Sequence, residues 1–239
     1  MRLDKFLSVT ATATRNEAGK AARSGRILVN GIAIKDASLH IDPEKDAVEY
    51  CGELVRYRKY TYIMLNKPQG YVSATEDGKD KTVLELLPEK LRDIGLFPCG
   101  RLDKNTTGLM LLTDNGELGH KLLAPKSHVS KTYGFKCEEP LSEEDASKLE
   151  QGVYIAGGYL TKPAKIMLLE SKTAGEITIT EGKYHQIKFM FEAVKNKITE
   201  LERLSFGPLK RDKNLERGEW RYLTDSEIAM LEKHCDKEK

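Results

Sequence analysis

Cysteine, long apolar runs and a strong net charge are all scarce in this sequence, and each shortage argues against a class of protein. The four cysteines form no CxxC pair, which argues against structural zinc and against a dense disulfide framework. No run reaches the roughly 18 to 20 apolar residues that span a bilayer, and the first residues lack the apolar core of a signal peptide. We therefore expect reduced thiols, a cytoplasmic location and no association with a membrane.

The net charge of +2 indicates nothing by itself, but the charges are unevenly distributed. Residues 1–35 contain seven basic and two acidic side chains, whereas residues 36–55 contain six acids against Lys45 alone. A basic face near the N-terminus suits a polyanion such as a nucleic acid. A charged helix that only faces solvent is the competing interpretation.

The first fifty residues predict two helices followed by a hairpin. Residues 2–8, RLDKFLS, place their apolar side chains on one helical face. Thr14 with Glu17 three residues later has the pattern of a capping box, so we expect a second helix over residues 15–24. Asn30-Gly31 then favours a tight turn between two strands, because both positions tolerate positive φ.

Beyond residue 60, strand patterns and helix patterns are mixed. We expect strands at YIMLNKP, GLMLLT, KTYGFKC, GEITIT and ITELERLSF. We expect helices at TVLELLP, GELGHKLLA, SEEDASKLEQG, YHQIKFMFEAV and TDSEIAMLEKH, with Ser142 and Thr224 as caps of two of them. Because strands and helices do not alternate strictly, we predict an α+β fold with a mixed, mainly antiparallel sheet.

The segments RLDKFLS, TRNEAGKAARSGRILVNG and IKD resemble the small RNA-binding domain named after ribosomal protein S4, in which two helices precede a hairpin. The resemblance covers about residues 1–50. Lys20 and Arg23 share a helix face, where basic side chains can contact RNA phosphates. The residues that we expect to bind RNA are Arg2, Lys5, Arg15, Lys20, Arg23, Arg26 and Asn30.

A single acid lies in the glycine-bounded loop GRLDKNTTG, directly before the apolar run LMLL. Asp103 stands between Arg101 and Lys104, and the next carboxylate along the chain is Asp114. A carboxylate held at the mouth of a buried strand can act as a nucleophile or as a base. A surface cluster of the three charges, worth under about 1 kcal/mol, is the alternative.

Three further segments accompany this loop: LNKPQGYVSA before it, HVSKTYGF after it and EGKYHQIKFMF further on. Together, the four segments resemble the pseudouridine synthases, in the branch that acts on ribosomal RNA and carries the S4-like domain. The resemblance continues through LERLSFGPLK and GEWRYLT, so it covers nearly the whole chain. It implies an isomerase that converts a uridine of ribosomal RNA into pseudouridine.

The resemblance also implies roles for single residues. Asp103 matches the catalytic aspartate, and Arg101 matches an arginine associated with that aspartate and with the extruded nucleotide. Tyr133 matches the tyrosine that stacks on the target base. Lys188 matches the basic residue that pairs with the aspartate, and Lys67-Pro68 matches a motif with a structural role.

The chemistry of this isomerisation explains why one carboxylate can suffice. The bond between ribose and the base nitrogen breaks, uracil turns, and a ring carbon joins the same ribose carbon. No atom enters or leaves, so we expect no cofactor and no metal. Uracil departs as a comparatively stable anion, so the second carboxylate that glycosidases use is not required. Whether Asp103 attacks the ribose carbon or removes a ribose proton stays open.

We therefore expect two domains in a monomeric enzyme: an S4-like RNA-binding domain over residues 1–58 and a catalytic domain over residues 60–239. EGKYHQIKFMF is closer to family members that modify 16S ribosomal RNA, although Phe189 occupies a position that is often basic. Two alternatives remain. One is a relative that modifies 23S ribosomal RNA, and the other is a non-catalytic RNA-binding factor of ribosome assembly.

Overall fold

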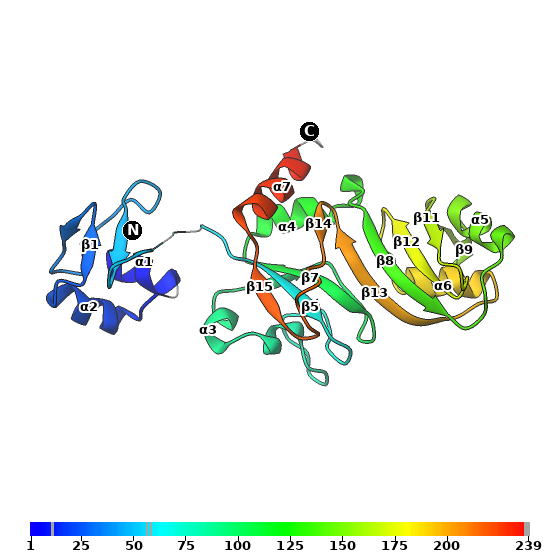
Figure 1. The fold of residues 1–239 in the computed structure, drawn as a ribbon, viewed down its shortest axis with the longest axis horizontal. Helices are drawn as coiled ribbons and strands as arrows, with labels where there is room; N and C mark the ends of the chain where they lie inside the picture. The colour runs from blue at the N-terminus through cyan, green and yellow to red at the C-terminus, as the bar shows by residue number, and fades with distance from the viewer. Residues whose placement is uncertain (11, 56, 58, 237–239) are drawn as a thin grey trace. The chain divides into compact units, whose positions relative to one another are not determined.

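The computed structural model describes residues 1–10, 12–55, 57 and 59–236. The chain divides into two compact units, Met1–Tyr60 and Thr61–Lys239 (Figure 1). The domain end predicted at residue 58 falls on a position outside the described residues. Among the described residues, no helix combines the length and the apolar character needed to cross a membrane.

The N-terminal unit has the predicted order of two helices and a hairpin, followed by two further strands. Its elements are α1 (Leu3–Val9), α2 (Arg15–Arg23), β1 (Ile27–Val29), β2 (Ile32–Ala33), β3 (Val48–Tyr50) and β4 (Glu53–Val55). Within the described residues the strands form a four-stranded sheet in the order β2-β1-β3-β4. The apolar faces of both helices pack into the core of this unit, where Leu3, Leu7 and Ile27 are fully buried.

Local sequence signals account for these boundaries. The Thr14 hydroxyl accepts a hydrogen bond from the Glu17 amide, and the Glu17 carboxylate accepts one from the Thr14 amide, so the predicted capping box is confirmed. The turn residues Asn30 and Gly31 both have positive φ, 52° and 79°, as the hairpin requires. The confirmed elements are those whose signals lie within a few residues of one another.

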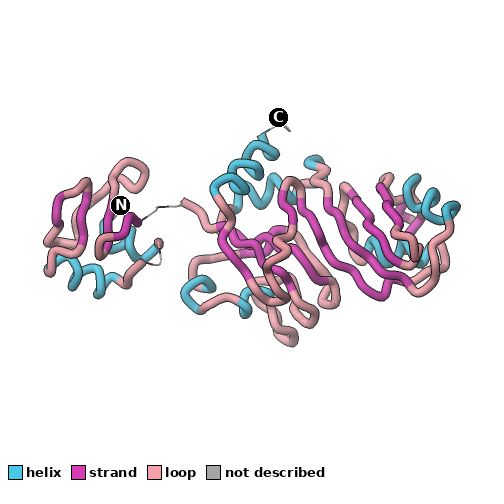
Figure 2. The backbone as a smooth tube through the Cα atoms, in the orientation of Figure 1, coloured by secondary structure: helices cyan, strands magenta, loops and turns pink. Residues whose placement is uncertain are grey.

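The C-terminal unit is built on one large sheet. Its strands are β5 (Tyr62–Lys67), β6 (Phe97–Cys99), β7 (Thr107–Thr113), β8 (Lys131–Cys137), β11 (Lys165–Leu168), β12 (Ala174–Ile179), β13 (Ile198–Phe206), β14 (Leu209–Lys210) and β15 (Trp220–Tyr222). Over the described residues the main order is β11-β12-β8-β13-β7-β5-β15, with β14 on β13 and β6 on β7. Figure 2 shows these strands as one continuous, curved sheet. The predicted α+β fold with a mainly antiparallel sheet is confirmed, and β7 with β13 is its parallel pair.

Helices cover the sheet at both of its ends. They are α3 (Glu89–Arg92), α4 (Gly116–Leu123), α5 (Glu143–Gln151), α6 (Gln186–Ala193) and α7 (Asp225–Asp236), with 3-10 turns η1 (Val83–Leu86) and η2 (Pro125–Ser127). A small hairpin of β9 (Tyr154–Ile155) and β10 (Tyr159–Leu160) contacts α6. Helix α4 lies beside α7 at one end, and α5 beside β11 at the other (Figure 1).

The helix predicted at TVLELLP is wrong. The structure has a single 3-10 turn there, and Leu87 is already extended, with φ −94° and ψ 152°. Leu87 precedes Pro88, and the proline ring disfavours helical angles at the residue before it. The pattern of apolar residues alone therefore overstated the length of this element.

A glycine permits the close approach of the parallel strands β7 and β13. Gly108, the second residue of β7, has φ 101°, and a Cβ built on it would lie 2.3 Å from the backbone oxygen of Arg203 on β13. Any other residue at this position would push the two strands apart. Gly108 closes the GRLDKNTTG loop, so the close strand pairing fixes where the loop ends.

Candidate active site

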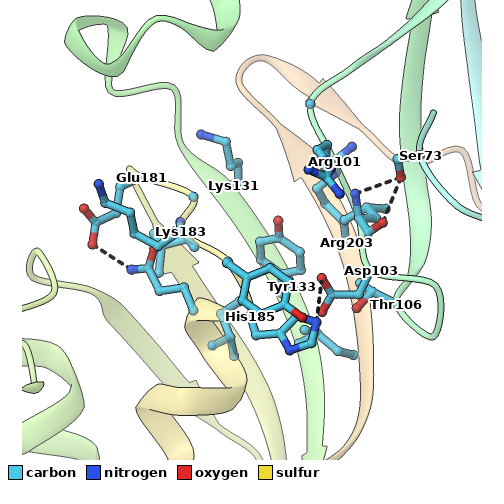
Figure 3. Close-up of a pocket in the computed structure, with 18 of the residues that line it drawn as sticks. Ser73, Arg101, Asp103, Thr106, Lys131, Tyr133, Glu181, Lys183, His185 and Arg203 are labelled. Carbon is cyan, nitrogen blue, oxygen red and sulfur yellow. Dashed lines mark hydrogen bonds and ion pairs between the residues drawn. The ribbon is translucent and has the colours of Figure 1, made fainter. Parts of the chain in front are cut away.

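A cleft of about 620 Å³ lies where the loop before β7, the strands β8 and β13, and the start of α6 meet. Asp103, Tyr133 and Lys188, which are far apart in sequence, all line it. Figure 3 shows Asp103 and Tyr133 together with Arg101, Lys131, His185 and Arg203. The cleft thus gathers all four residues that the resemblance associates with catalysis.

The Asp103 carboxylate lies between two nitrogen groups supplied by α6 and its N-cap. Lys188 Nζ is 2.8 Å from Asp103 Oδ2, and His185 Nε2 is 3.5 Å from Oδ1. The Asp103 and Lys188 side chains are 27% and 28% exposed, so the pair is shielded from solvent but open to the cleft. The predicted pairing of Lys188 with Asp103 is what the structure shows.

Lys67, at the end of β5, holds the backbone of the Asp103 loop through hydrogen bonds to its carbonyl oxygens. Lys67 is fully buried, and its ammonium group donates to the carbonyl oxygens of Pro68, Asp103, Lys104 and Thr106 at 2.8 to 3.2 Å. Burial lowers the pKa of Lys67 to about 8, with Arg203 and Arg217 acting in the same direction and Asp103 opposing them. The carbonyl oxygens of the loop surround the ammonium group as they would surround a bound metal cation.

Additional hydrogen bonds hold the same loop. The Ser73 hydroxyl donates to the Leu102 carbonyl at 2.8 Å and accepts from the Leu102 amide at 2.9 Å. The Thr106 amide donates to the Asp103 carbonyl at 3.0 Å. Rigid support of this kind keeps a reactive carboxylate within reach of its target.

Tyr133 is held in β8 by neighbours on both sides. It pairs with Ile177 on β12 and with Arg203 on β13, and it is 7% exposed. The ring lines the same cleft as Asp103. An aromatic face in such a position can hold a base that has left its stack.

Arg101 lines the cleft, but among the described residues it forms no ion pair with Asp103. Within the part of the chain that the structure describes, Arg101 forms no ion pair, and the partners of the Asp103 carboxylate are Lys188 and His185. The arginine is exposed at the rim of the cleft. The structure therefore brings only one of the two expected cations, Lys188, to the aspartate.

His185 is the residue whose position the sequence did not reveal. It caps α6 in a left-handed conformation, φ 47°, and its ring stacks on Tyr184 at a centroid distance of 3.9 Å. This places the imidazole beside the Asp103 carboxylate. A histidine before a helix has no spacing signal toward a distant aspartate, so only the fold could show the contact.

The residues expected to bind RNA on the N-terminal unit fall into two groups. Lys5, Lys20 and Arg23 are exposed and form no ion pair among the described residues, and Arg15 is exposed as well. The others already have partners: Arg2 binds Asp4, Arg26 binds Ser24, and Asn30 binds Asp46 and the amide of Ala47. The first group remains available to a polyanion.

Potential metal ligands are dispersed. In the described ranges, no three side chains of His, Cys, Asp and Glu gather as a metal-binding set. Burial raises the pKa of Cys99 to about 12, so this thiol stays protonated at neutral pH.

Comparison with known proteins identifies the family. A family profile described as RNA pseudouridylate synthase matches residues 61–193, and an S4 domain profile matches residues 1–47. The chain belongs to the RNA pseudouridylate synthase family. This pseudouridine synthase is an isomerase with an N-terminal S4 domain. Asp103, Tyr133 and Lys188 lie within the matched region, whereas Arg203 on the cleft wall follows it.

The similarity to known proteins covers almost the whole chain of the synthase. A Bacillus subtilis protein described as an uncharacterised RNA pseudouridine synthase, YtzG, is 47% identical, covering 97% of this chain and 98% of its own. Ribosomal small subunit pseudouridine synthase A of Salmonella typhimurium is 42% identical, covering 97% and 100%. A crystal structure of a pseudouridylate synthase matches with a TM-score of 0.69 and 39% identity, covering 97% and 99%.

Proposed function

We propose that this synthase isomerises one uridine of 16S ribosomal RNA to pseudouridine, with Asp103 as its single catalytic carboxylate. The observation that carries the proposal is the 2.8 Å ion pair between Asp103 and Lys188 on the wall of a cleft that also holds Tyr133. The substrate nucleotide leaves the RNA stack and enters this cleft, with its uracil against the Tyr133 ring.

The proposed reaction conserves all atoms. The bond between C1′ and N1 breaks, the uracil anion turns within the cleft, and C5 bonds to C1′. The proton on C5 is then lost and N1 gains one. The ionised Asp103 either attacks C1′ or removes a ribose proton to begin the sequence, and both routes need the carboxylate fixed close to the sugar.

The assignment to 16S ribosomal RNA rests on similarity. The relatives named ribosomal small subunit pseudouridine synthase A are 40% to 42% identical over at least 97% of this chain. The exposed basic residues of the S4 domain, Lys5, Lys20 and Arg23, supply a surface for RNA phosphates. We propose that the enzyme works as a monomer on this RNA.

Mapping pseudouridines across both large ribosomal RNAs tests the proposal. The maps are compared between the parent strain, a strain lacking the gene, and deletion strains that carry either the wild-type gene or the Asp103→Asn variant. We expect one 16S position to lose modification in the deletion strain. The wild-type gene should restore it, and Asp103→Asn should not, although the variant still binds RNA.

The alternatives give different maps. Loss of a 23S position would move the target to the large subunit while leaving the role of Asp103 intact. Full restoration by Asp103→Asn would contradict the role of this carboxylate. Identical maps with and without the gene would contradict an enzymatic role on ribosomal RNA.

A further inference from the structure

Two cations in the cleft, Lys131 and Arg203, have no role in the reaction as proposed. Lys131 begins β8, two residues before Tyr133, and Arg203 lies opposite Tyr133 on β13. Both line the cleft, and Figure 3 shows them on its wall with Arg101 and Tyr133. Arg203 is 1% exposed, which is unusual for a guanidinium group without a carboxylate partner.

The two cations share a single aromatic ring. Lys131 Nζ is 5.8 Å and Arg203 Cζ is 5.1 Å from the centroid of Phe206. Burial lowers the pKa of Lys131 to about 8, and the positive charge of Arg203 acts in the same direction. The arrangement costs folding free energy unless an anion joins it.

No carboxylate of the described residues neutralises this pair. Arg203 Nε donates to the Leu109 carbonyl at 2.7 Å, and Nη2 reaches only the weakly accepting sulfur of Met110 at 3.7 Å. Lys131 Nζ donates to the Val129 carbonyl at 2.6 Å. Neither cation forms an ion pair within the described ranges, so both retain unused donor capacity.

Glu181 is the carboxylate whose charge acts on Lys131, and it already accepts hydrogen bonds from other residues. Glu181 accepts hydrogen bonds from the Tyr159 hydroxyl, the Lys162 amide and the Gln186 side chain, at 2.7 to 2.9 Å. Glu181 forms no ion pair with Lys131 among the described residues. The described part of the chain therefore supplies no carboxylate that completes the pair, which leaves the site suited to an external anion.

Gly100 lies beside Arg203 at the cleft. A Cβ built on Gly100 would lie 3.3 Å from Leu123 Cδ2 and 3.8 Å from Arg203 Nη1, an ordinary van der Waals distance. The backbone there has φ 85°, a conformation that favours glycine. Gly100 and Arg203 both line the cleft, so the loop that carries Asp103 reaches the guanidinium group of Arg203.

We propose that Lys131 and Arg203 form a binding site for a backbone phosphate of the RNA, next to the uridine that enters the cleft. This inference rests on the proposed reaction, because the RNA strand must pass this wall when the uridine reaches Asp103. A planar guanidinium and an ammonium group are the donors that proteins use for phosphodiesters. The site fixes the nucleotide through its backbone and carries no base specificity.

A double-substitution experiment tests the site. The protein is the full chain, as wild type or Lys131→Gln, and the RNA is the ribosomal fragment whose uridine loses modification in the deletion strain. Methylphosphonate, which lacks the charge of a phosphate, replaces each of the two phosphates flanking that uridine in turn. Affinity and the rate of pseudouridine formation are measured for every combination.

We expect one methylphosphonate to weaken wild-type binding about tenfold, the size of one charge-assisted contact. Lys131→Gln should weaken binding of unmodified RNA by a similar factor and lose nothing further with that methylphosphonate. The slope of log affinity against log salt should become shallower by about 0.7. Equal methylphosphonate penalties in wild type and Lys131→Gln would overturn the proposal.

Two control variants and a competitor check that the loss belongs to this site. Lys136→Gln changes a lysine of the same strand whose side chain is 60% exposed and pairs with Glu200, and it should leave affinity and salt slope unchanged. Arg203→Lys keeps the positive charge but removes the paired N–H donors of the guanidinium group, and we expect a partial loss of RNA affinity. Competition by inorganic phosphate as strong as by RNA would overturn the assignment to a phosphodiester.

The experiment also distinguishes this inference from the proposed function. Turnover of unmodified RNA by the wild type reports the reaction, whereas the methylphosphonate penalty reports the phosphate contact. Wild-type turnover with no penalty at either phosphate would overturn the site and leave the reaction intact. RNA binding with a penalty but without turnover would contradict the reaction and support the site.

Discussion

Two lysines of the C-terminal unit are withdrawn from solvent and partnered in opposite ways. Lys67, under the Asp103 loop, donates to four carbonyl oxygens. Lys131, on the cleft wall, donates to one carbonyl and shares the Phe206 ring with Arg203. Burial lowers the pKa of each lysine to about 8.

The comparison shows that burial alone does not separate a structural cation from a ligand-binding one. The oxygens around Lys67 use up its donors, so it can stabilise the loop but has nothing left for a substrate. Lys131 has unused donors and a positive neighbour, so it is suited to an external anion. The number of hydrogen-bond partners distinguishes the structural lysine from the ligand-binding one.

Removing the Lys67 cage should have the largest effect. Lys67→Met leaves four carbonyl oxygens without the ammonium group, and we expect about 3 kcal/mol less unfolding free energy. Turnover should fall about a hundredfold, because the loop no longer fixes Asp103. Urea unfolding and single-turnover kinetics measure both. Lys104→Met is the control: it removes an exposed ion pair with Asp80 and should cost under about 1 kcal/mol.

Lys188 is the cleft lysine that does have a carboxylate partner. Lys188→Met should lower turnover about 10- to 100-fold with little change in RNA affinity, because Asp103 loses the cation 2.8 Å away. Lys188→Arg keeps the charge and should recover part of the rate. Lys183→Met, at a lysine that lies over the Tyr159 ring, is the matched control. Wild-type turnover in Lys188→Met would contradict a role for the pair.

The pH dependence of stability should reveal the cost of Lys131. Its pKa is about 8 in the folded protein against an ordinary value of 10.5, so the unfolded chain binds more protons between these pH values. Stability contributed by this residue therefore rises with pH across that window. Allowing for solvent screening, Lys131→Met should be about 1 kcal/mol more stable than wild type below pH 8, with the difference narrowing toward pH 10.5.

Urea unfolding at a series of pH values measures this difference. Lys67→Met provides the contrast, because its carbonyl partners make the lysine favourable despite its lowered pKa. A Lys131→Met variant less stable than wild type at neutral pH would contradict the idea that Lys131 is held at a cost.

The exposed cations of the S4 domain should give the smallest effect. Lys20→Gln combined with Arg23→Gln should weaken RNA binding about threefold to tenfold and make its salt dependence shallower, because two phosphate contacts are lost. Turnover at saturating RNA should stay unchanged. Lys45→Gln, at a lysine whose side chain is 82% exposed, serves as the control in the same unit. A lower rate at saturating RNA would contradict a role in affinity alone.

The sequence predicts best what short stretches determine. The capping box of α2, the Asn30-Gly31 turn and the long strands β5, β7, β8 and β13 follow from neighbouring residues and apolar patterns. The strands β9, β10 and β14 have two residues each, too few for any periodicity to show. The turn at η1 depends on Pro88 more than on the apolar pattern before it.

The site divides in the same way. Asp103, Tyr133 and Lys188 were found through motifs, and their roles remain predictions. The carbonyl cage of Lys67 depends on the path of a loop more than thirty residues away. The contact of both Lys131 and Arg203 with the Phe206 ring depends on the register between β8 and β13, which includes a shift between Arg203 and Ser205. Neither arrangement has a local sequence pattern.

Release of tritium from the C5 position of uridine tests the central claim most directly, because isomerisation must detach that hydrogen. The RNA is the fragment identified by mapping, and the proteins are wild type, Asp103→Asn and Asp114→Asn. Asp114 is the matched control, since it accepts the Thr61 amide at 2.6 Å outside the cleft. We expect Asp103→Asn to bind the fragment normally and release no tritium, while Asp114→Asn releases it at the wild-type rate. Tritium release by Asp103→Asn at the wild-type rate would contradict the account.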